Sequence, residues 1–233
     1  MKTNKFYKWL MESPMVYYLY NRGSIIYGLN TKESDIDFLV IVDPEFILPE
    51  EFEEYKTKGY DYRDISYNVF IDNCDFIFFT TNEWFSKVTH GDIIAWECAC
   101  LPKKFIHKEH VKLMMSTDPL QLRKDIDEYL ELYCLIASDH FQKKEFKNWK
   151  KQLWDTIKYT KLANQIIENH KIIDFKAANF EYKQLVENDC EDEEIILKLW
   201  LDLIKDPINF LHKSTDGMLK KEKEKKIIQN EKK

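Results

Sequence analysis

Two aspartates, Asp35 and Asp37, stand directly before the apolar run 38–42. In a β-strand the side chains alternate faces, so both carboxylates point the same way, with their Cα atoms about 6 to 7 Å apart. Like charges this close repel each other unless a cation compensates them. Oxygen-only ligands favour Mg²⁺ or Mn²⁺, and magnesium commonly takes one or two carboxylates together with phosphate oxygens. The pattern predicts that a metal ion and a phosphate-bearing ligand bind together.

The dipeptide Gly23-Ser24 follows a Val- and Tyr-rich segment, residues 15–21, and precedes the two aspartates. Glycine lets the backbone approach a phosphate closely, the Ser24 hydroxyl adds a donor, and backbone N–H groups at the start of a following helix favour an anion. Alone, a Gly-Ser pair or an Asp-x-Asp is more often a turn or the end of a surface strand. Their order here, between two predicted strands, indicates a phosphate site beside the metal.

A third carboxylate is expected from a neighbouring strand, and Asp75 is the first choice. It opens the apolar run 76–79 and shares a face with Ile77 and Phe79. A carboxylate that faces the interior needs a partner, which a metal ion would supply. The alternative is that Asp75 only ends the hairpin turn at Asp72-Asn73, and Asp72 is the second choice for the third carboxylate.

Together these residues resemble the polymerase-beta-like nucleotidyltransferases, whose pattern is Gly-Ser, a spacer, Asp-x-Asp and a distant third Asp. More narrowly, Gly-Ser-x-x-Tyr-Gly-Leu at 23–29, followed by Ser34-Asp35-x-Asp37, resembles the RlaP-type predicted nucleotidyltransferases. The resemblance covers roughly residues 15–106. The chain departs from that subfamily at His90-Gly91-Asp92, where a Gly-Asn-Pro element is usual, and this affects the acceptor side of the site.

The resemblance implies a reaction in which an acceptor hydroxyl attacks the α-phosphorus of a nucleoside triphosphate and pyrophosphate leaves. Asp35 and Asp37 would hold one Mg²⁺ or Mn²⁺ with the triphosphate, and Asp75 would share a second ion or accept the hydroxyl proton. Gly23, Ser24 and Ser34 would hold the nucleotide, for example ATP. The implied catalytic and metal-binding residues are therefore Asp35, Asp37 and Asp75.

For several further residues the sequence allows two interpretations, a role at the site or a structural position. Lys158 and Lys161 lie in a predicted helix and, by the same resemblance, would contact the triphosphate, although most lysines in so charged a chain are solvated. Arg22 suits either phosphate contact or a strand-end surface position. A partly exposed helical position is favoured for Glu97 over a role at the site, and the pair His107 and His110 lacks a third ligand for zinc.

Hydrophobic periodicity predicts an α+β protein, in which an N-terminal mixed-sheet nucleotidyltransferase domain precedes an all-helical C-terminal domain. The expected elements of the first domain are a helix at 5–11, strands at 15–21 and 35–42, a hairpin around Asp72-Asn73 and a helix from Thr81, after which no further strand is expected. Residues 44–62 are expected to be a weakly helical lid or insertion.

Apolar stripes at helical spacing follow from about residue 118, and another predicted helix spans 193–211. The predicted division is a nucleotidyltransferase domain at 1–115, a helical domain at 116–219 and a charged, disordered tail at 220–233. The lysine-rich composition of the last segment is the reason for its assignment as a tail.

The net charge of −6 disfavours broad binding to duplex DNA, because that affinity comes from neutralising phosphates. Apolar runs far shorter than about 20 residues and the lack of a signal-peptide pattern predict a cytoplasmic protein without membrane association. Its five cysteines match neither a disulfide framework nor a zinc ribbon.

Three functions remain open at this stage. The first is a nucleotidyltransferase that uses a nucleoside triphosphate and an unknown acceptor, which is a protein, an RNA end or a small molecule. The second is a catalytically inactive binding or regulatory module, such as an antitoxin-like subunit. The third is an enzyme that processes tRNA or broken RNA ends, which would need a continuous basic path to Asp75.

Overall fold

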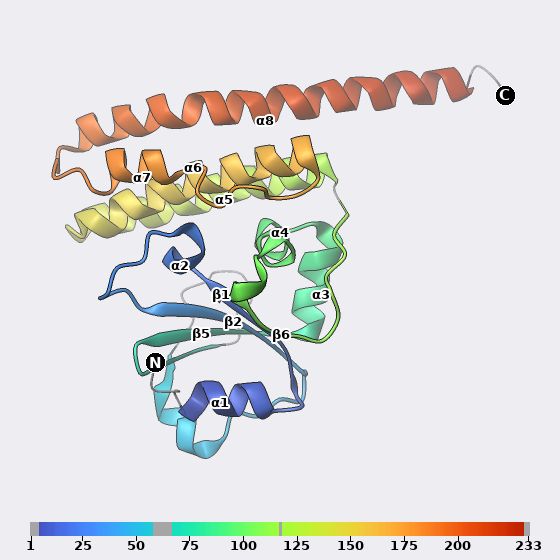
Figure 1. Ribbon diagram of the computed structural model, residues 1–233. Helices are drawn as coiled ribbons and strands as arrows, with labels where there is room; N and C mark the ends of the chain where they lie inside the picture. The colour runs from blue at the N-terminus through green and yellow to red at the C-terminus, as the bar shows by residue number, and fades with distance from the viewer. Residues whose placement is uncertain (1–4, 58–66, 117, 231–233) are drawn as a thin grey trace. The chain divides into compact units, whose positions relative to one another are not determined.

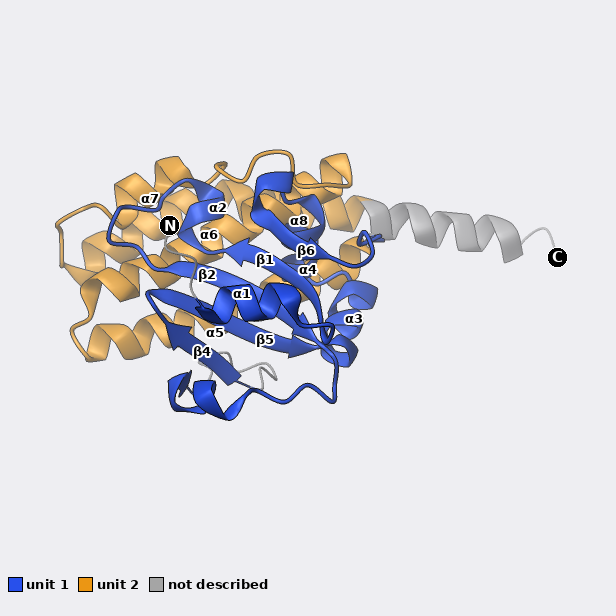
Figure 2. Cartoon of the chain, turned by 60° about the horizontal axis from the view of Figure 1, so that its bottom comes forward, with its two compact units in different colours: residues 1–116 blue, residues 117–233 orange. Residues whose placement is uncertain are grey.

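The computed structural model describes residues 5–57, 67–116 and 118–230 (Figure 1). The chain divides into two compact units, residues 1–116 and 117–233 (Figure 2). The first unit contains a mixed β-sheet with flanking helices, and the second is built from helices. The predicted α+β class is confirmed.

A six-stranded sheet with the strand order β3-β4-β5-β2-β1-β6 forms the centre of the first unit. Its strands are β1 (Val16–Arg22), β2 (Ile36–Val42), β3 (Lys56–Thr57), β4 (Tyr67–Ile71), β5 (Cys74–Thr80) and β6 (Ile106–Glu109). Strands β2 and β5 pair in parallel, whereas the other neighbours are antiparallel. Because β2 and β5 are parallel, their N-terminal ends lie next to each other at the same end of the sheet.

One face of the sheet is covered by α1 (Lys5–Glu12), as Figure 1 shows. The helix was predicted from the spacing of Phe6 and Leu10, and both side chains are fully buried. Phe6 meets Phe76 of β5 edge-on, with ring centroids 5.0 Å apart. Phe38 of β2 stacks on Phe76 at 4.8 Å, so an aromatic core fills this side of the sheet.

The opposite face carries α3 (Thr81–His90) and α4 (Ile93–Cys100). Trp84 of α3 is fully buried and lies against Tyr20 of β1 and Phe79 of β5. Side chains two or four residues apart in a strand project to the same face. Asp75 lies four residues before Phe79 in β5, and Asp37 pairs with Asp75, so both aspartates project to this face. The α3 side is therefore the side on which the predicted carboxylates lie.

One expectation for the first unit was wrong. The sheet does not end with β5, because β6 pairs with β1 and extends the edge. Four residues that include Lys108 and Glu109 are too short and too polar to show a strand period, which is why the sequence did not reveal this strand. Residues 44–57 contain a 3-10 helix at Glu50–Tyr55 before β3, in agreement with the expected weak helical character, and the role as a lid or insertion stays a prediction. Residues 58–62 of the predicted lid lie outside the described residues.

The second unit consists of α5 (Pro119–Gln142), α6 (Phe146–Asn169), α7 (Asn179–Leu185) and α8 (Glu193–Asn230). Apolar side chains on the predicted stripes are buried, among them Ile126, Ile166 and Ile196. Helix α7 was not predicted, because seven residues are too few to display a helical period.

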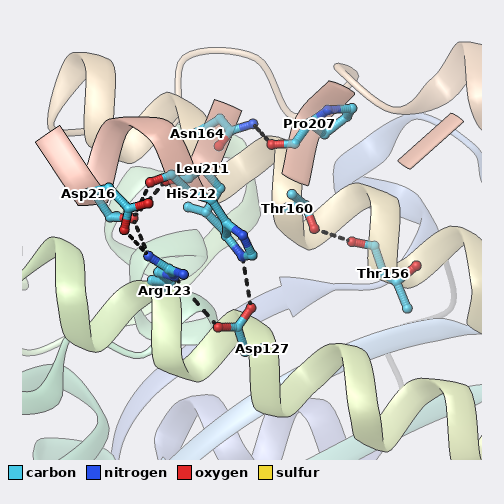
Figure 3. Close-up of polar contacts among 10 residues, drawn as sticks. Arg123, Asp127, Thr156, Thr160, Asn164, Pro207, Leu211, His212 and Asp216 are labelled. Carbon is cyan, nitrogen blue, oxygen red and sulfur yellow. Dashed lines mark hydrogen bonds and ion pairs between the residues drawn. The ribbon is translucent and has the colours of Figure 1, made fainter. Parts of the chain in front are cut away.

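Helix α8 continues past the expected end at residue 211, although Pro207 lies inside it. Residues 220–230, assigned from the sequence to a charged tail, form its last turns, and Lys and Glu are residues of high helix propensity. Residues 231–233 lie outside the described residues. Side chains of α5 and α6 contact α8 at the proline and beyond it: Asn164 Nδ2 donates to the Pro207 carbonyl at 2.9 Å, and Arg123 Nη1 to Asp216 at 2.7 Å (Figure 3).

Across the ranges that the structure describes, no helix combines the length and apolar character needed to span a membrane.

The N-terminus of α3 gives a direct test of a local sequence signal. Thr80 accepts from the Glu83 N–H at 3.3 Å, and the Glu83 carboxylate accepts from the Thr80 N–H at 2.6 Å. We expect Thr80→Ala to lower the free energy of unfolding by about 1 kcal/mol, because it removes the capping oxygen. Urea denaturation measures this loss. Thr81→Ala is the control, and an equal loss in that variant would show that the cap is misassigned.

Candidate active site

Three charged side chains form a row across the sheet at the ends of neighbouring strands. Arg22 of β1 pairs with Asp37 of β2, and Asp37 pairs in parallel register with Asp75 of β5. Directly paired residues project to the same face, and adjacent strands are about 4.8 Å apart. The structure therefore brings two of the three predicted carboxylates together and places a guanidinium beside them.

Asp75 has a perturbed carboxyl group. Its pKa is raised to about 6, first by desolvation and then by the negative charges of Asp37 and Asp35, while Arg22 opposes the shift. Its hydrogen-bond contact from Asn68 Nδ2 is long, at 3.5 Å. A bound cation would relieve this repulsion.

Gly23 directly follows Arg22, and its backbone conformation requires a glycine at this position. With φ 65° and ψ −152°, it lies in a region that is essentially restricted to glycine. A Cβ atom on Gly23 would lie 1.7 Å from Asp37 Oδ2, so no other residue fits without displacing that carboxylate. The glycine is required by contact with Asp37 as well as by its positive φ. Ser24 follows as the first residue of the short helix α2 (Ser24–Tyr27).

Behind the row, a buried carboxylate joins three elements. Glu97 of α4 is 2% exposed, lies 3.9 Å from Arg22 Nη2 and accepts a hydrogen bond from the Tyr27 hydroxyl of α2. The expectation of a partly exposed Glu97 was wrong, and Arg22 is not a surface residue. Helix α4 is buried from Ile93 through Cys98, so its sequence has no polar face that could indicate which side is solvated.

Asp35 and Ser34 lie just before β2. Asp35 is exposed, and its charge contributes to the raised pKa of Asp75. Ser34 Oγ accepts from the Thr31 N–H at 2.9 Å, and the Ser34 carbonyl accepts from Asn73 Nδ2 at 3.2 Å. Ser34 thus ties the loop that carries Asp35 to the β4–β5 turn, and its predicted nucleotide contact stays a prediction.

The family model described as "Nucleotidyltransferase domain" matches residues 7–113, which include every element of this row. Residues 7–113 form a nucleotidyltransferase domain. The resemblance to the polymerase-beta-like nucleotidyltransferases is confirmed, while the narrower RlaP type stays a prediction.

Other comparisons add little to this assignment. The solved structure of a nucleotidyltransferase-like protein from Exiguobacterium sibiricum 255-15 is similar at 9% sequence identity, covering 92% of this chain and 77% of that chain, with a TM-score of 0.32. A search among curated proteins finds no match.

The two lysines predicted to contact triphosphate lie in the helical unit, outside the nucleotidyltransferase domain. Lys158 pairs with Asp155 and lies 4.1 Å from the ring centroid of Tyr159. Lys161 pairs with Glu181 at 2.5 Å. Both ammonium groups have carboxylate partners within their own unit, and their contact with a nucleotide stays a prediction.

His107 and Asp72 have structural surroundings of their own. His107 Nδ1 lies 2.9 Å from the Tyr7 hydroxyl and Nε2 lies 2.7 Å from Asn21 Oδ1, so both ring nitrogens are engaged. Burial lowers the His107 pKa. Asp72 and Asn73 both have positive φ, as a two-residue hairpin turn requires, so Asp72 serves the turn.

The carboxylates of the nucleotidyltransferase domain suit magnesium in their chemistry. Among the described residues, no group of three or more His, Cys, Asp or Glu side chains is placed to hold a metal ion, so Asp35 does not join Asp37 and Asp75 in such a group. Magnesium does not require one, because it keeps several waters and combines one or two carboxylates with substrate phosphates. Asp37 and Asp75, in register and with a raised Asp75 pKa, fit that incomplete ligand set.

The raised Asp75 pKa predicts a pH-dependent stability. A folded-state pKa above the unfolded value favours the protonated form, so the native state loses stability as pH rises from about 4 to 6. In metal-free buffer we expect Asp75→Asn to be more stable than wild type at pH 8 by about 1 to 3 kcal/mol, with the difference vanishing near pH 4. Urea denaturation in EDTA across this range measures it. A gain that does not change with pH would contradict the electrostatic origin.

The buried Arg22–Glu97 pair predicts non-additive losses of stability. Glu97→Leu leaves the Arg22 guanidinium without this carboxylate, and we expect a loss of about 3 to 5 kcal/mol. Replacing both residues with Leu should cost clearly less than the sum of the two single losses, because neither member of the pair is then left buried without the other. Equilibrium unfolding of the two single variants and the double variant measures the coupling. Simple additivity would show that the two side chains do not interact.

Proposed function

We propose that the chain is a magnesium-dependent nucleotidyltransferase that moves a nucleoside monophosphate from a nucleoside triphosphate to an acceptor hydroxyl, with release of pyrophosphate. The family match supports nucleotidyl transfer in general. The observation that carries the finer proposal is the register pairing of Asp37 with Asp75 next to the close contact between Gly23 and Asp37.

In this proposal, Asp35 and Asp37 hold the metal with the triphosphate, and Asp75 completes the site on the acceptor side. Magnesium bound there would neutralise charge on the triphosphate and on the leaving pyrophosphate. The exposed position of Asp35 suits contact with a ligand that arrives from solvent. Asp37 lies against the Gly23 backbone, in the space that a side chain at position 23 would occupy.

Asp75 is the group that takes the acceptor's proton. The acceptor oxygen forms a bond to the α-phosphorus, the bond from that phosphorus to the pyrophosphate oxygen breaks, and the hydroxyl proton passes to Asp75. Even with the pKa near 6 that it has in the metal-free site, this carboxylate is ionised at neutral pH and is able to accept a proton. Arg22, within electrostatic reach of Asp75, limits how far this pKa rises.

The nucleotide side of the site is formed by Gly23 and Ser24. Gly23 brings the backbone close to Asp37, so phosphate and metal ligands converge within a few ångströms. The buried Glu97 fixes this corner by contacting both Arg22, one residue before Gly23, and Tyr27, three residues after Ser24. The acceptor is a protein, an RNA end or a small molecule, and the net charge of −6 disfavours a long RNA.

Calorimetric binding of ATP, GTP, CTP and UTP, with and without magnesium, tests the proposal. We expect at least one triphosphate to bind in a magnesium-dependent manner, and an Asp35→Asn, Asp37→Asn double variant to weaken that binding more than tenfold, since it removes both metal-binding charges. The bound nucleotide, labelled at its α-phosphate, then identifies the acceptor in transfer assays.

A charge-matched control distinguishes the loss of metal-binding carboxylates from a general effect of net charge on triphosphate binding. A Glu45→Gln, Glu50→Gln double variant removes two charges from exposed positions of the same unit and should bind as wild type does. If folded wild-type protein binds no triphosphate with magnesium, the enzyme proposal fails and a binding or regulatory module is favoured.

A further inference from the structure

A second concave site lies within the helical unit. The hollow has a volume of about 700 Å³ and is lined by residues of α6, of the segment 171–178, of α7 and of α8. This volume falls within the range typical of small-molecule sites. All its lining residues belong to residues 117–233, so the hollow is not part of the row of carboxylates described above.

The lining is strongly acidic. Asp174, Glu181, Asp202 and Asp206 contribute carboxylates, and Lys161 is the basic side chain among the lining residues. Lys161 is already paired with Glu181 at 2.5 Å and also donates to a backbone carbonyl, so the remaining carboxylates are not neutralised by it. A cation would be attracted to this surface, and an anion such as a nucleotide phosphate would be repelled.

Two buried acceptor atoms of the lining residues lack a donor. Glu181 is only 8% exposed, and its Oε2 atom has no hydrogen-bond partner among the described residues. The same holds for Asn164 Oδ1, because the amide nitrogen of Asn164 is directed at the Pro207 carbonyl (Figure 3). A buried acceptor without a donor costs about 1 to 3 kcal/mol. Both atoms are covered by their neighbours, so a ligand bearing N–H groups recovers this cost when the two side chains turn toward the hollow.

Pro207 lies at the same place and lacks the N–H that a helix residue normally donates. A helical carbonyl normally accepts from the N–H four residues later, and Pro207 has no N–H to offer the carbonyl of Leu203. Leu203 and Pro207 both line the hollow. The proline thus removes a donor at the point of α8 where the acidic lining and the unpaired acceptors lie.

The rest of the lining is apolar and suits a hydrocarbon body. Ile173 is 60% exposed and Phe210 37% exposed, although both are large hydrophobic side chains. Together with Leu203 they offer a surface for methylene groups next to the carboxylates. The matching ligand has an alkyl body and at least one positively charged group rich in N–H donors.

We propose that this hollow binds a small free amine, an alkyl ammonium or alkyl guanidinium compound. The charged group contacts Glu181 and the α8 carboxylates, Asp202 and Asp206, and the alkyl body lies on Ile173 and Phe210. Recognition by a lysine or arginine side chain of another protein would use the same chemistry, and the experiment distinguishes the two sources. The proposal does not depend on nucleotidyl transfer.

Isothermal titration of the full chain with putrescine, spermidine and agmatine, in EDTA and at low ionic strength, tests this site. We expect one-to-one binding that weakens with added salt, since the attraction is electrostatic. Asp202→Asn and Asp206→Asn should each raise the Kd about threefold to tenfold, because each removes one attractive charge. Glu181→Gln, which keeps an acceptor for Lys161, should do the same. 1,4-Butanediol, an uncharged analogue of putrescine, should not bind.

Glu168→Gln is the matched control, because it removes an exposed carboxylate of α6 outside the hollow. Unaltered binding in this variant, with weakened binding in the other three, supports the proposal. Absence of binding by every amine, or equal affinity in all variants, overturns it. A short lysine peptide that binds more than tenfold tighter than any free amine would also overturn it, by assigning the hollow to a protein side chain.

Discussion

The parallel pairing of β2 with β5 is the constraint on which the site depends. It sets Asp37 opposite Asp75, so two like charges are held within one strand spacing of each other on a partly desolvated surface. Such an arrangement is unfavourable by itself and has to be imposed by the surrounding structure. The imposing force is the burial of Phe38 and Phe76, which stack on the other face one residue further along the same two strands.

The remainder of the nucleotidyltransferase domain holds the groups that balance this repulsion. Arg22 occupies the next position of the row, and Glu97 holds Arg22 from behind while accepting a hydrogen bond from Tyr27. Helix α4 therefore stabilises the site through Arg22 and through Tyr27 of α2. Its burial on all sides fits this internal role, since Glu97 would be costly there without its two partners.

Much of the sheet and part of the site could be predicted from the sequence, because both rest on local patterns. The strands β1, β2 and β5 are long apolar runs, and the face on which Asp37 and Asp75 lie follows from strict alternation. Three features depend on tertiary contacts that no local pattern encodes. These are the short polar strand β6, the burial of Glu97 in an apolar helix, and the register that pairs Asp37 with Asp75. The pair of Lys161 with Glu181 belongs to the same class, whereas Lys158 and Asp155 lie three residues apart on one helix, a spacing that the sequence itself displays.

The edge strand β6 also determines the order in which the first unit can be completed. Tyr20 of β1 pairs with Ile106, so this edge of β1 stays open until nearly the whole unit has been synthesised. Contacts of such large sequence separation slow folding, because loop-closure entropy is lost before they form. Until then β1 presents unpaired backbone groups next to Tyr18 and Tyr20, which is the type of edge that promotes aggregation. Strand β6 therefore covers the open edge of β1 late in synthesis. A nascent chain that ends before β6 leaves the backbone of β1 exposed, just before the Gly23-Ser24 turn.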